Sequence, residues 1–495
     1  MFSYRAGNSP ERDPRHARST PVSNQRAGRF VGHRRRPAAD RLRGMTEVNA
    51  RATVGQAAGR AQVVAWGFWD WGSSAFNAVI LTFVFSVYLT DKVGDDLPGP
   101  FSSSTWLGLT LGAAGLLVAL TAPIFGQRFD ASAKRKRSLA FLTGLCIASM
   151  TLLFFVHDDY HYLGYGLLLL GLGSAFFELA SVPYNAMLRQ VSTPDNVGRV
   201  SGFGWAMGYF GGIFLLLICY FGFISGDGDN RGLLGIPTDD GLNIRLVAVV
   251  AAVWFAAFAL PVLFTVAELP RTDADPGAAN AGFFASYKVL FRDLGELWRV
   301  DQRIVWFLLA SAVFRDGLAG VFTFGAVLAV RVYDIAEADV LLFGIAANVV
   351  AALGAIVAGR LDDRGGPKRV IVVSLVSMIV CGLALLVVSG PLMFWIFGLL
   401  LTVFVGPAQS ASRSFLARLA PPGREGQIFG LYTTTGRAVS FLAPLSFALF
   451  TILFDTDRAG IVGLVLVLAL GLGALLPVRS PAPTDVQTGP VDKLK

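Results

Sequence analysis

The stretch that decides the fold is Ala65-Trp-Gly-Phe-Trp-Asp70-Trp-Gly-Ser-Ser-Ala-Phe-Asn77-Ala-Val-Ile-Leu-Thr-Phe-Val-Phe85, which opens an apolar run that reaches Leu89. A helix of about 20 residues crosses the hydrocarbon core of a bilayer, so the run is long enough to span it. A helical period places Asp70, a serine one turn further on, and Asn77 on one face. Because a charge at the centre of a membrane helix costs at least about 2.5 kcal/mol, we expect this polar stripe to face protein or a water-filled cavity.

A second interpretation keeps Asp70 at the membrane surface. Trp66, Trp69 and Trp71 would then form an interfacial aromatic belt around it. Asn77 continues the stripe two turns deeper, which favours the buried stripe over the belt.

The composition of the whole chain indicates a helical membrane protein. Its 495 residues are 54% hydrophobic and 15% charged, whereas soluble domains carry about 25% charged residues. Apolar runs of spanning length recur along the chain, and we expect twelve transmembrane helices. They cover residues 63–90, 104–127, 138–157, 161–188, 200–224, 244–267, 303–331, 339–359, 369–389, 391–412, 427–454 and 459–478.

The basic residues predict the orientation of these spans. Lys and Arg gather in alternate loops, and the loops between them are acidic. Since basic residues stay preferentially on the cytoplasmic side, we expect both termini to be cytoplasmic. The same distribution accounts for the net charge of +8 without a nucleic-acid partner.

We expect five parts along the chain. They are a disordered Arg-rich cytoplasmic tail (1–60), an N-terminal six-helix bundle (61–267), a cytoplasmic linker with an amphipathic helix (268–302), a C-terminal six-helix bundle (303–479) and a disordered tail (480–495). The first tail contains Met45, which is a second candidate for the start of the native chain.

Three sequence patterns recur in the same order in both halves. Phe68-x-Asp70 matches Phe314-x-Asp316, Gly126-x-x-x-Asp130 matches Gly359-x-x-x-Asp363, and Leu188, Gly198 and Gly202 match Leu416, Gly426 and Gly430. Parallel six-span repeats are typical of one large transporter architecture.

The two Gly-x-x-x-Asp segments, each followed by basic residues, resemble the cytoplasmic loop motif of the major facilitator superfamily. Glycine lets two helices approach closely, and a basic residue or a helix N-terminus can hold the acid. The resemblance implies that Asp130 and Asp363 help to close a cytoplasmic gate; a solvated basic loop is the alternative. The predicted gate residues are Gly126, Asp130, Arg135, Gly359, Asp363 and Arg369.

Longer stretches resemble one family within this superfamily. They are Trp66–Phe76, Tyr184–Leu188 with Gly198–Gly212, and Gly406–Arg418 with Phe429–Arg437. Together they are similar to the bacterial branch of the family of the vacuolar, autophagy-related amino-acid effluxers. The resemblance implies a secondary transporter working by alternating access that exports small solutes, which in the fungal members are amino acids. It also implies that the protein lies in a bacterial plasma (inner) membrane.

Polar residues inside the predicted spans form a candidate site. Glu178 and Asn185 share one helical face, whereas Arg315 and Asp316 point about 100° apart and need separate partners. We predict that facing spans bring the acids against Arg315, Arg413 or Arg437. Glu178 is the predicted proton carrier, because a desolvated carboxylate can exchange protons; a permanent ion pair is the alternative. The predicted substrate or proton pathway comprises Asp70, Asn77, Glu178, Asn185, Arg315, Asp316, Asn348, Gln409, Arg413, Tyr432 and Arg437.

A mixture of acids and arginines suits amino acids or related zwitterions, and also sugars, short peptides or drugs. A membrane-embedded enzyme would need a His, Cys or metal cluster at one membrane face, and these residues are scattered, so we expect no catalysis, metal or cofactor. Without a phosphate-binding loop, protons rather than ATP are the expected energy source. A membrane-embedded protein that does not transport, such as a sensor or scaffold, is a more distant alternative. The expected partners of a monomer are the solute, protons and the bilayer.

The Met45 start predicts that peptide mass spectrometry of the native protein detects no peptide from residues 1–44. A peptide from within that segment would contradict it.

Overall fold

The computed structural model describes residues 59–132, 134–268 and 283–480. The predicted tails, Met45 and the first part of the linker therefore lie outside the described residues, apart from the few positions where the tails meet the helices. The described helices belong to one compact unit.

The described residues contain twelve helical segments long and apolar enough to cross a membrane, which confirms the predicted twelve-span, all-α membrane fold. The segments are Arg60–Asp91, Ser103–Ser132, Arg135–Phe155, Tyr160–Val191, Val197–Ile224, Asp239–Thr265, Gln302–Tyr333, Leu342–Gly365, Pro367–Val387, Pro391–Leu419, Glu425–Phe454 and Asp457–Leu475.

The elements before the linker are named here the N-terminal bundle. They are α2 (Arg60–Ser74), η1 (Ala75–Phe83), α3 (Phe85–Asp91), α4 (Ser103–Ser132), α5 (Arg135–Leu152), η2 (Leu153–Phe155), η3 (Tyr160–Tyr162), α6 (Leu163–Ala186), α7 (Leu188–Val191), α8 (Val197–Cys219), η4 (Tyr220–Ile224), β1 (Asn230–Arg231), β2 (Ile236–Pro237), η5 (Asp239–Gly241) and α9 (Leu242–Thr265). The strands form a small antiparallel hairpin that pairs Asn230 with Pro237.

The linker helix α11 (Phe283–Val300) precedes the C-terminal bundle. This bundle consists of α12 (Gln302–Tyr333), α13 (Glu337–Gly365), α14 (Pro367–Val387), α15 (Pro391–Val403), α16 (Val405–Leu419), α17 (Glu425–Ala438), α18 (Leu442–Phe454), η6 (Asp457–Ala459) and α19 (Gly460–Leu475).

The first span is not one continuous α-helix. α2 ends at Ser74 and a π-helical segment, η1, follows it. A π-helix has more residues per turn than an α-helix, so it rotates the later side chains away from the face that the sequence period predicts. Asn77 is exposed, and its side chain has no hydrogen-bond partner among the described residues.

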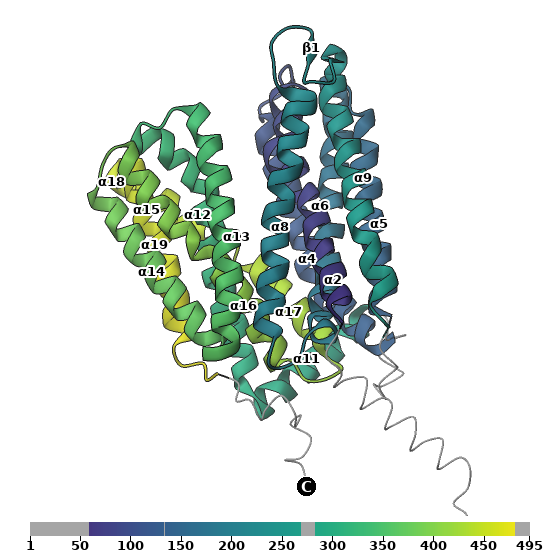
Figure 1. The fold of residues 1–495 in the computed structure, drawn as a ribbon, viewed down its shortest axis with the longest axis vertical. Helices are drawn as coiled ribbons and strands as arrows, with labels where there is room; N and C mark the ends of the chain where they lie inside the picture. The colour runs from purple at the N-terminus through teal and green to yellow at the C-terminus, as the bar shows by residue number, and fades with distance from the viewer. Residues whose placement is uncertain (1–58, 133, 269–282, 481–495) are drawn as a thin grey trace, which may run out of the picture. The chain divides into compact units, whose positions relative to one another are not determined.

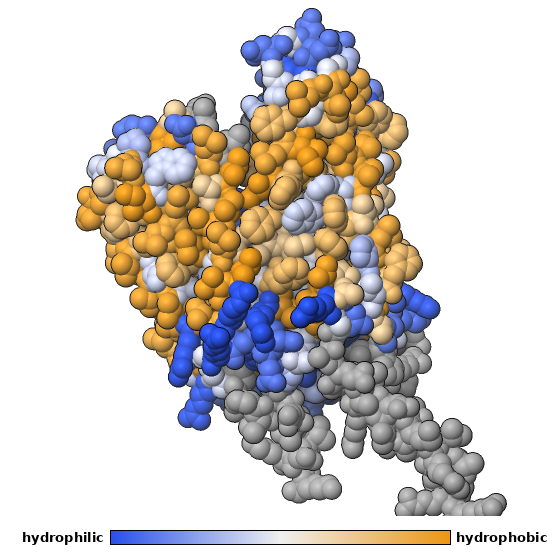
Figure 2. All heavy atoms as spheres, in the orientation of Figure 1, coloured by the Kyte–Doolittle hydropathy of each residue, from blue (hydrophilic) through white to orange (hydrophobic). Residues whose placement is uncertain are grey.

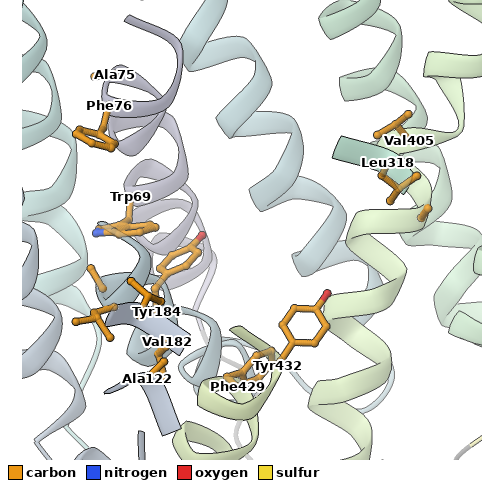
Figure 3. Close-up of a cluster of buried hydrophobic side chains, with 14 of the residues drawn as sticks. Trp69, Ala75, Phe76, Ala122, Val182, Tyr184, Leu318, Val405, Phe429 and Tyr432 are labelled. Carbon is orange, nitrogen blue, oxygen red and sulfur yellow. The ribbon is translucent and has the colours of Figure 1, made fainter. Parts of the chain in front are cut away.

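Aromatic packing fills the interior of the N-terminal bundle around this span. Trp66 and Trp69 are 0% and 2% exposed, so the alternative of an interfacial belt is wrong for both rings. Their indole N–H groups donate to the Tyr184 carbonyl and the Thr143 hydroxyl, each at 3.1 Å. Figure 3 shows Trp69 beside Tyr184, with ring centroids 4.2 Å apart, and Tyr432 on a helix of the other bundle.

The outward sides of the helices are apolar, as a bilayer requires. Phe264 and Ile452 are 81% and 77% exposed. Figure 2 shows hydrophobic surface along the flanks of both bundles, with hydrophilic residues gathered toward the two ends. The end with the Lys- and Arg-rich loops at 134–137, 364–369 and 418–424 is called the basic end below; the β1–β2 hairpin lies at the opposite, acidic end (Figure 1).

The two bundles contact each other mainly through two helix pairs, α4 with α17 and α8 with α13. The two Gly-x-x-x-Asp motifs lie on α4 and α13, and the repeated glycine pairs (Gly198 and Gly202, Gly426 and Gly430) lie on α8 and α17. The repeats predicted from the sequence therefore lie on the helices that join the bundles.

Candidate functional site

Arg413 of α16 lies between the bundles with only 5% of its side chain exposed. Its Nη1 atom lies 3.1 Å from Asp70 Oδ2 of α2, which is the predicted acid. Its Nη2 donates to the Ser201 carbonyl at 2.6 Å and its Nε to the Ser201 hydroxyl at 3.0 Å. A buried guanidinium is tolerated only when a counter-ion neutralises it and acceptors bind its N–H groups. Here Asp70 is the counter-ion and Ser201 provides the acceptors, and both belong to the N-terminal bundle.

Aromatic rings and an amide complete the surroundings of Arg413. The guanidinium carbon lies 4.8 Å from the Trp66 ring centroid and 5.5 Å from that of Trp205. Tyr184 donates a 2.7 Å hydrogen bond to Asp70, and Asn185 accepts a long one, 3.4 Å, from Arg413. Asp70, Asn185 and Arg413 therefore form one cluster across the bundle interface.

A second ion pair joins the bundles nearby. Arg437 of α17 donates to Glu178 of α6, and these side chains are 32% and 25% exposed. This pair is more exposed than the Asp70–Arg413 pair, whose side chains are 18% and 5% exposed.

Arg315 and Asp316 do have separate partners, but the predicted acid–arginine pairing is wrong for Asp316. Asp316 is buried and accepts a 2.6 Å hydrogen bond from the Ala443 backbone N–H of α18. Arg315 points toward α17 instead. Its guanidinium carbon lies 3.7 Å from the Tyr432 ring centroid, and Nη1 donates to the Tyr432 carbonyl at 3.0 Å.

The remaining predicted pathway residues differ in their surroundings. Gln409 accepts a 2.6 Å hydrogen bond from Tyr209 of α8, and the Tyr432 hydroxyl lies 2.7 Å from that of Ser412. Asn348 donates to the Gly344 carbonyl of its own helix, and Asn77 is not in the cluster. We call the five ionisable residues Asp70, Glu178, Arg315, Arg413 and Arg437 the polar layer.

The predicted gate residues lie at the basic end, where α4 crosses α17. Asp130 accepts from the backbone N–H groups of Gly426 and Gln427, at 3.0 and 2.8 Å, at the start of α17. Arg135 binds Asp130 at 2.5 Å and Glu425 at 2.6 Å. An acid at a helix N-terminus is favourable because the free N–H groups and the helix dipole attract negative charge.

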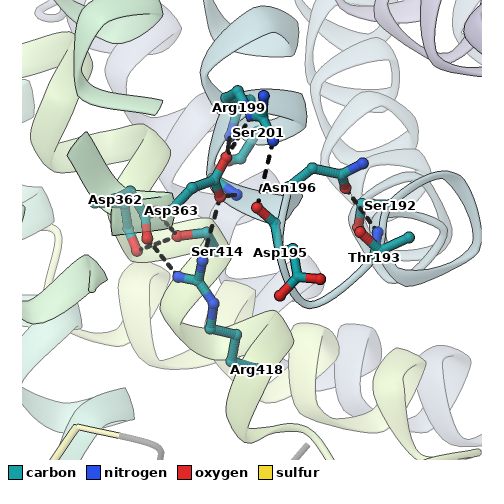
Figure 4. A network of polar contacts seen from close by, with 12 residues as sticks. Ser192, Thr193, Asp195, Asn196, Arg199, Ser201, Asp362, Asp363, Ser414 and Arg418 are labelled. Atoms are coloured by element: carbon teal, nitrogen blue, oxygen red, sulfur yellow. Dashed lines mark hydrogen bonds and ion pairs between the residues drawn. The ribbon is translucent and has the colours of Figure 1, made fainter. Parts of the chain in front are cut away.

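The crossing of α13 with α8 repeats this arrangement with the bundles exchanged (Figure 4). Asp363 accepts from the backbone N–H of Gly198 at 2.7 Å, at the start of α8, and from the Arg199 side chain at 2.8 Å. Asp362 is paired with Arg418. The prediction for Arg369 is wrong: it is exposed and binds no acid among the described residues, because Arg199 and Arg418 occupy that role.

The linker helix also reaches this end, which the sequence did not indicate. Asp293 of α11 is 7% exposed and accepts from Gln127 at 3.4 Å and Gln427 at 3.2 Å. These glutamines directly follow Gly126 and Gly426. The linker helix is thus hydrogen-bonded to both α4 and α17, which adds to the closure of the basic end.

Other polar contacts between the bundles involve the polar layer and its neighbours. Tyr209 donates to Gln409, and the Thr434 hydroxyl of α17 donates to the Ala119 carbonyl of α4 at 2.9 Å. Together with the two crossings, these contacts join the bundles from the basic end to the polar layer.

This fold, with recurring acid-to-helix contacts at the two crossings, defines a transporter of the major facilitator superfamily. Among solved structures, the proton:xylose symporter XylE is similar with a TM-score of 0.66 at 13% identity over 86% of this chain and 96% of that chain. The transporter FucP in its outward conformation is similar with a TM-score of 0.64 at 14% identity over 85% of this chain and 98% of that chain.

The chain belongs to the family described as vacuole effluxer Atg22 like, whose model matches residues 103–482. It is 26% identical over 85% of its length to an uncharacterized MFS-type transporter, YxiO, of Bacillus subtilis, of which it covers 96%. It is 25% identical over 60% of its length to autophagy-related protein 22-1 of Neosartorya fischeri, of which it covers 49%. The chain thus spans about half the length of that fungal relative.

Asp70→Ala is expected to destabilise the protein, because it leaves Arg413 buried without its counter-ion. Removing one partner of a buried ion pair costs about 3–5 kcal/mol, which thermal unfolding in detergent detects as a lower melting temperature. Asn77→Ala, in the same span, is the control and should leave the melting temperature unchanged. Equal melting temperatures for both variants would contradict the structural role of the pair.

Gly126→Ala is expected to open the basic end. A Cβ at Gly126 would collide with the Gly426 backbone, whereas one at Gly112 of the same helix meets nothing within 4 Å. The measurement is maleimide labelling of Ser410→Cys, a position 2% exposed where α16 meets α8. Labelling should accelerate with Gly126→Ala and not with Gly112→Ala; equal rates would show that the crossing does not control access.

Proposed function

We propose that the protein is a proton-coupled secondary transporter that exports amino acids or related zwitterions by alternating access. The observation that supports it most is the Glu178–Arg437 pair, which joins the bundles and is still partly exposed. An intramembrane acid and base at such a place are typical of proton and substrate pathways. The family's description as effluxers supports export.

The geometry suggests how access alternates. With the basic end closed, a solute reaches the polar layer from the acidic end. Opening the basic end requires Asp130 and Asp363 to leave the helix N-termini that they bind across the interface. The side chains of Asp130 and Asp363 are only 5% and 6% exposed, so these contacts must be replaced by others when the basic end opens. In the proposal, the differential binding of the solute to the two states, a few kcal/mol, shifts the equilibrium between them.

Glu178 couples this change to protons in the proposal. A protonated Glu178 no longer attracts Arg437 as an ion, so the second link between the bundles weakens when a proton binds. The more deeply buried Asp70–Arg413 pair is the structural link, and Glu178 is the exchangeable one, as their exposures suggest.

The setting of the protein follows from the same proposal. The basic end faces the cytoplasm of a bacterium, since basic loops stay inside. In this proposal the protein acts as a monomer in the plasma membrane.

Glu178→Gln is expected to abolish the effect of a pH gradient on transport, because the amide cannot carry a proton. In proteoliposomes, one pH unit can drive at most about tenfold accumulation per proton coupled. The variant should lose this accumulation and retain exchange of labelled solute for unlabelled solute.

Glu296→Gln serves as the control, because Glu296 is an exposed carboxylate on α11 paired with Arg424. It should behave like the wild type. An unchanged pH response in Glu178→Gln would remove Glu178 from the coupling role.

A further inference from the structure

We propose that Arg315, stacked on Tyr432, binds the carboxylate group of the transported solute. This inference rests on the proposed transport function and assigns one part of the solute to one residue.

Arg315 is the guanidinium of the polar layer that has no counter-ion. Arg413 pairs with Asp70 and Arg437 pairs with Glu178, whereas no acid lies within ion-pair distance of Arg315 among the described residues. Its sequence neighbour Asp316 points away and binds the backbone of α18. The polar layer thus contains three guanidiniums and two carboxylates, and the guanidinium without an ionic partner is that of Arg315.

A lone cation inside a membrane-spanning helix is costly, so it normally faces a water-filled space or an anion. Arg315 is partly exposed. Only Nη1 makes a hydrogen bond within the described residues, and neither Nε nor Nη2 is among the buried polar atoms that lack a partner. Neither nitrogen therefore has an acceptor within the described residues, and neither is fully buried.

The tyrosine fixes the direction of these donors. The guanidinium lies over the Tyr432 ring at 3.7 Å, and Tyr432 is in turn held by Ser412. One face of the guanidinium is covered, so ligands approach its edge. The edge presents parallel N–H groups that match the two oxygens of a carboxylate.

The guanidinium also lies close to the backbone of α17. A Cβ at Gly436 would lie 3.2 Å from Arg315 Nη1, so α17 passes close beside the guanidinium at a residue without a side chain. The next residue, Arg437, holds Glu178. Gly436, next to the arginine that pairs with Glu178, therefore lies against Arg315, and an acid and a free guanidinium in the same layer suit a solute with both a carboxylate and an amine. A neutral sugar would leave Arg315 without an anionic partner.

The test measures binding of matched ligands to the purified full-length protein by thermal shift, independently of transport. Each L-amino acid is compared with its carboxamide, which retains the amine and side chain and lacks the carboxylate. Acids should stabilise the wild type and amides should not. Arg315→Gln should weaken binding of the acid about 10–100-fold, as expected for loss of a charged hydrogen-bonded contact, and Arg315→Lys should weaken it less.

Arg331→Gln is the matched control on the same helix, because Arg331 is 68% exposed near Asp457. It should bind like the wild type. Equal binding of an acid to the wild type and to Arg315→Gln would overturn the assignment while leaving proton-driven transport intact. Amides that bind as well as acids, or no stabilisation by any acid, would also overturn it. Transport by the wild-type protein that does not respond to a pH gradient would instead count against the proposed function.

Discussion

The structure depends on one constraint: a guanidinium buried between two membrane-spanning bundles must find its charge partner and its acceptors on the opposite bundle. Arg413 meets this requirement with Asp70 and both oxygen atoms of Ser201. In a low-dielectric interior, such a group holds its surroundings in one arrangement, since any displacement leaves a charge unpaired. The bundles are therefore joined by an ion pair and hydrogen bonds as well as by apolar packing.

Below this link, the two crossings close the basic end in a pseudo-symmetric way. Asp130 of the N-terminal bundle binds the start of α17, and Asp363 of the C-terminal bundle binds the start of α8. Each acid binds the N-terminus of a helix in the other bundle, so opening either crossing breaks a contact between the bundles. Asp293 of the linker adds a bond to each helix of the first crossing. Opening the basic end therefore requires the contacts of both crossings and of the linker to break.

The sequence predicted much of this arrangement because membrane spans and repeats leave strong one-dimensional signals. Twelve apolar runs and a repeated Gly-x-x-x-Asp motif were sufficient for the fold and for the acids Asp130 and Asp363. Costly charges in apolar runs pointed to Asp70, Glu178, Arg413 and Arg437, although their roles in transport stay predictions.

The partner of each charged residue was harder to predict from the sequence than its position in a span. Asp316 matches Asp70 in sequence yet binds a backbone N–H, because the partner depends on which helix faces it. Arg369 follows the motif, but Arg199 and Arg418 are nearer to Asp363. The π-helical turn after Ser74, which displaced Asn77, left no signal in the periodicity.

The most direct test of the central claim measures distances between the bundles at both ends in the same reconstituted protein. Spin labels at Arg137 and Arg364 report on the basic end, and labels at Asp96 and Asp339 report on the acidic end; all four positions are exposed. If the polar layer is the pivot of alternating access, lowering the pH or adding a transported solute should lengthen one distance and shorten the other. Distances that stay fixed, or that lengthen together, would contradict the account.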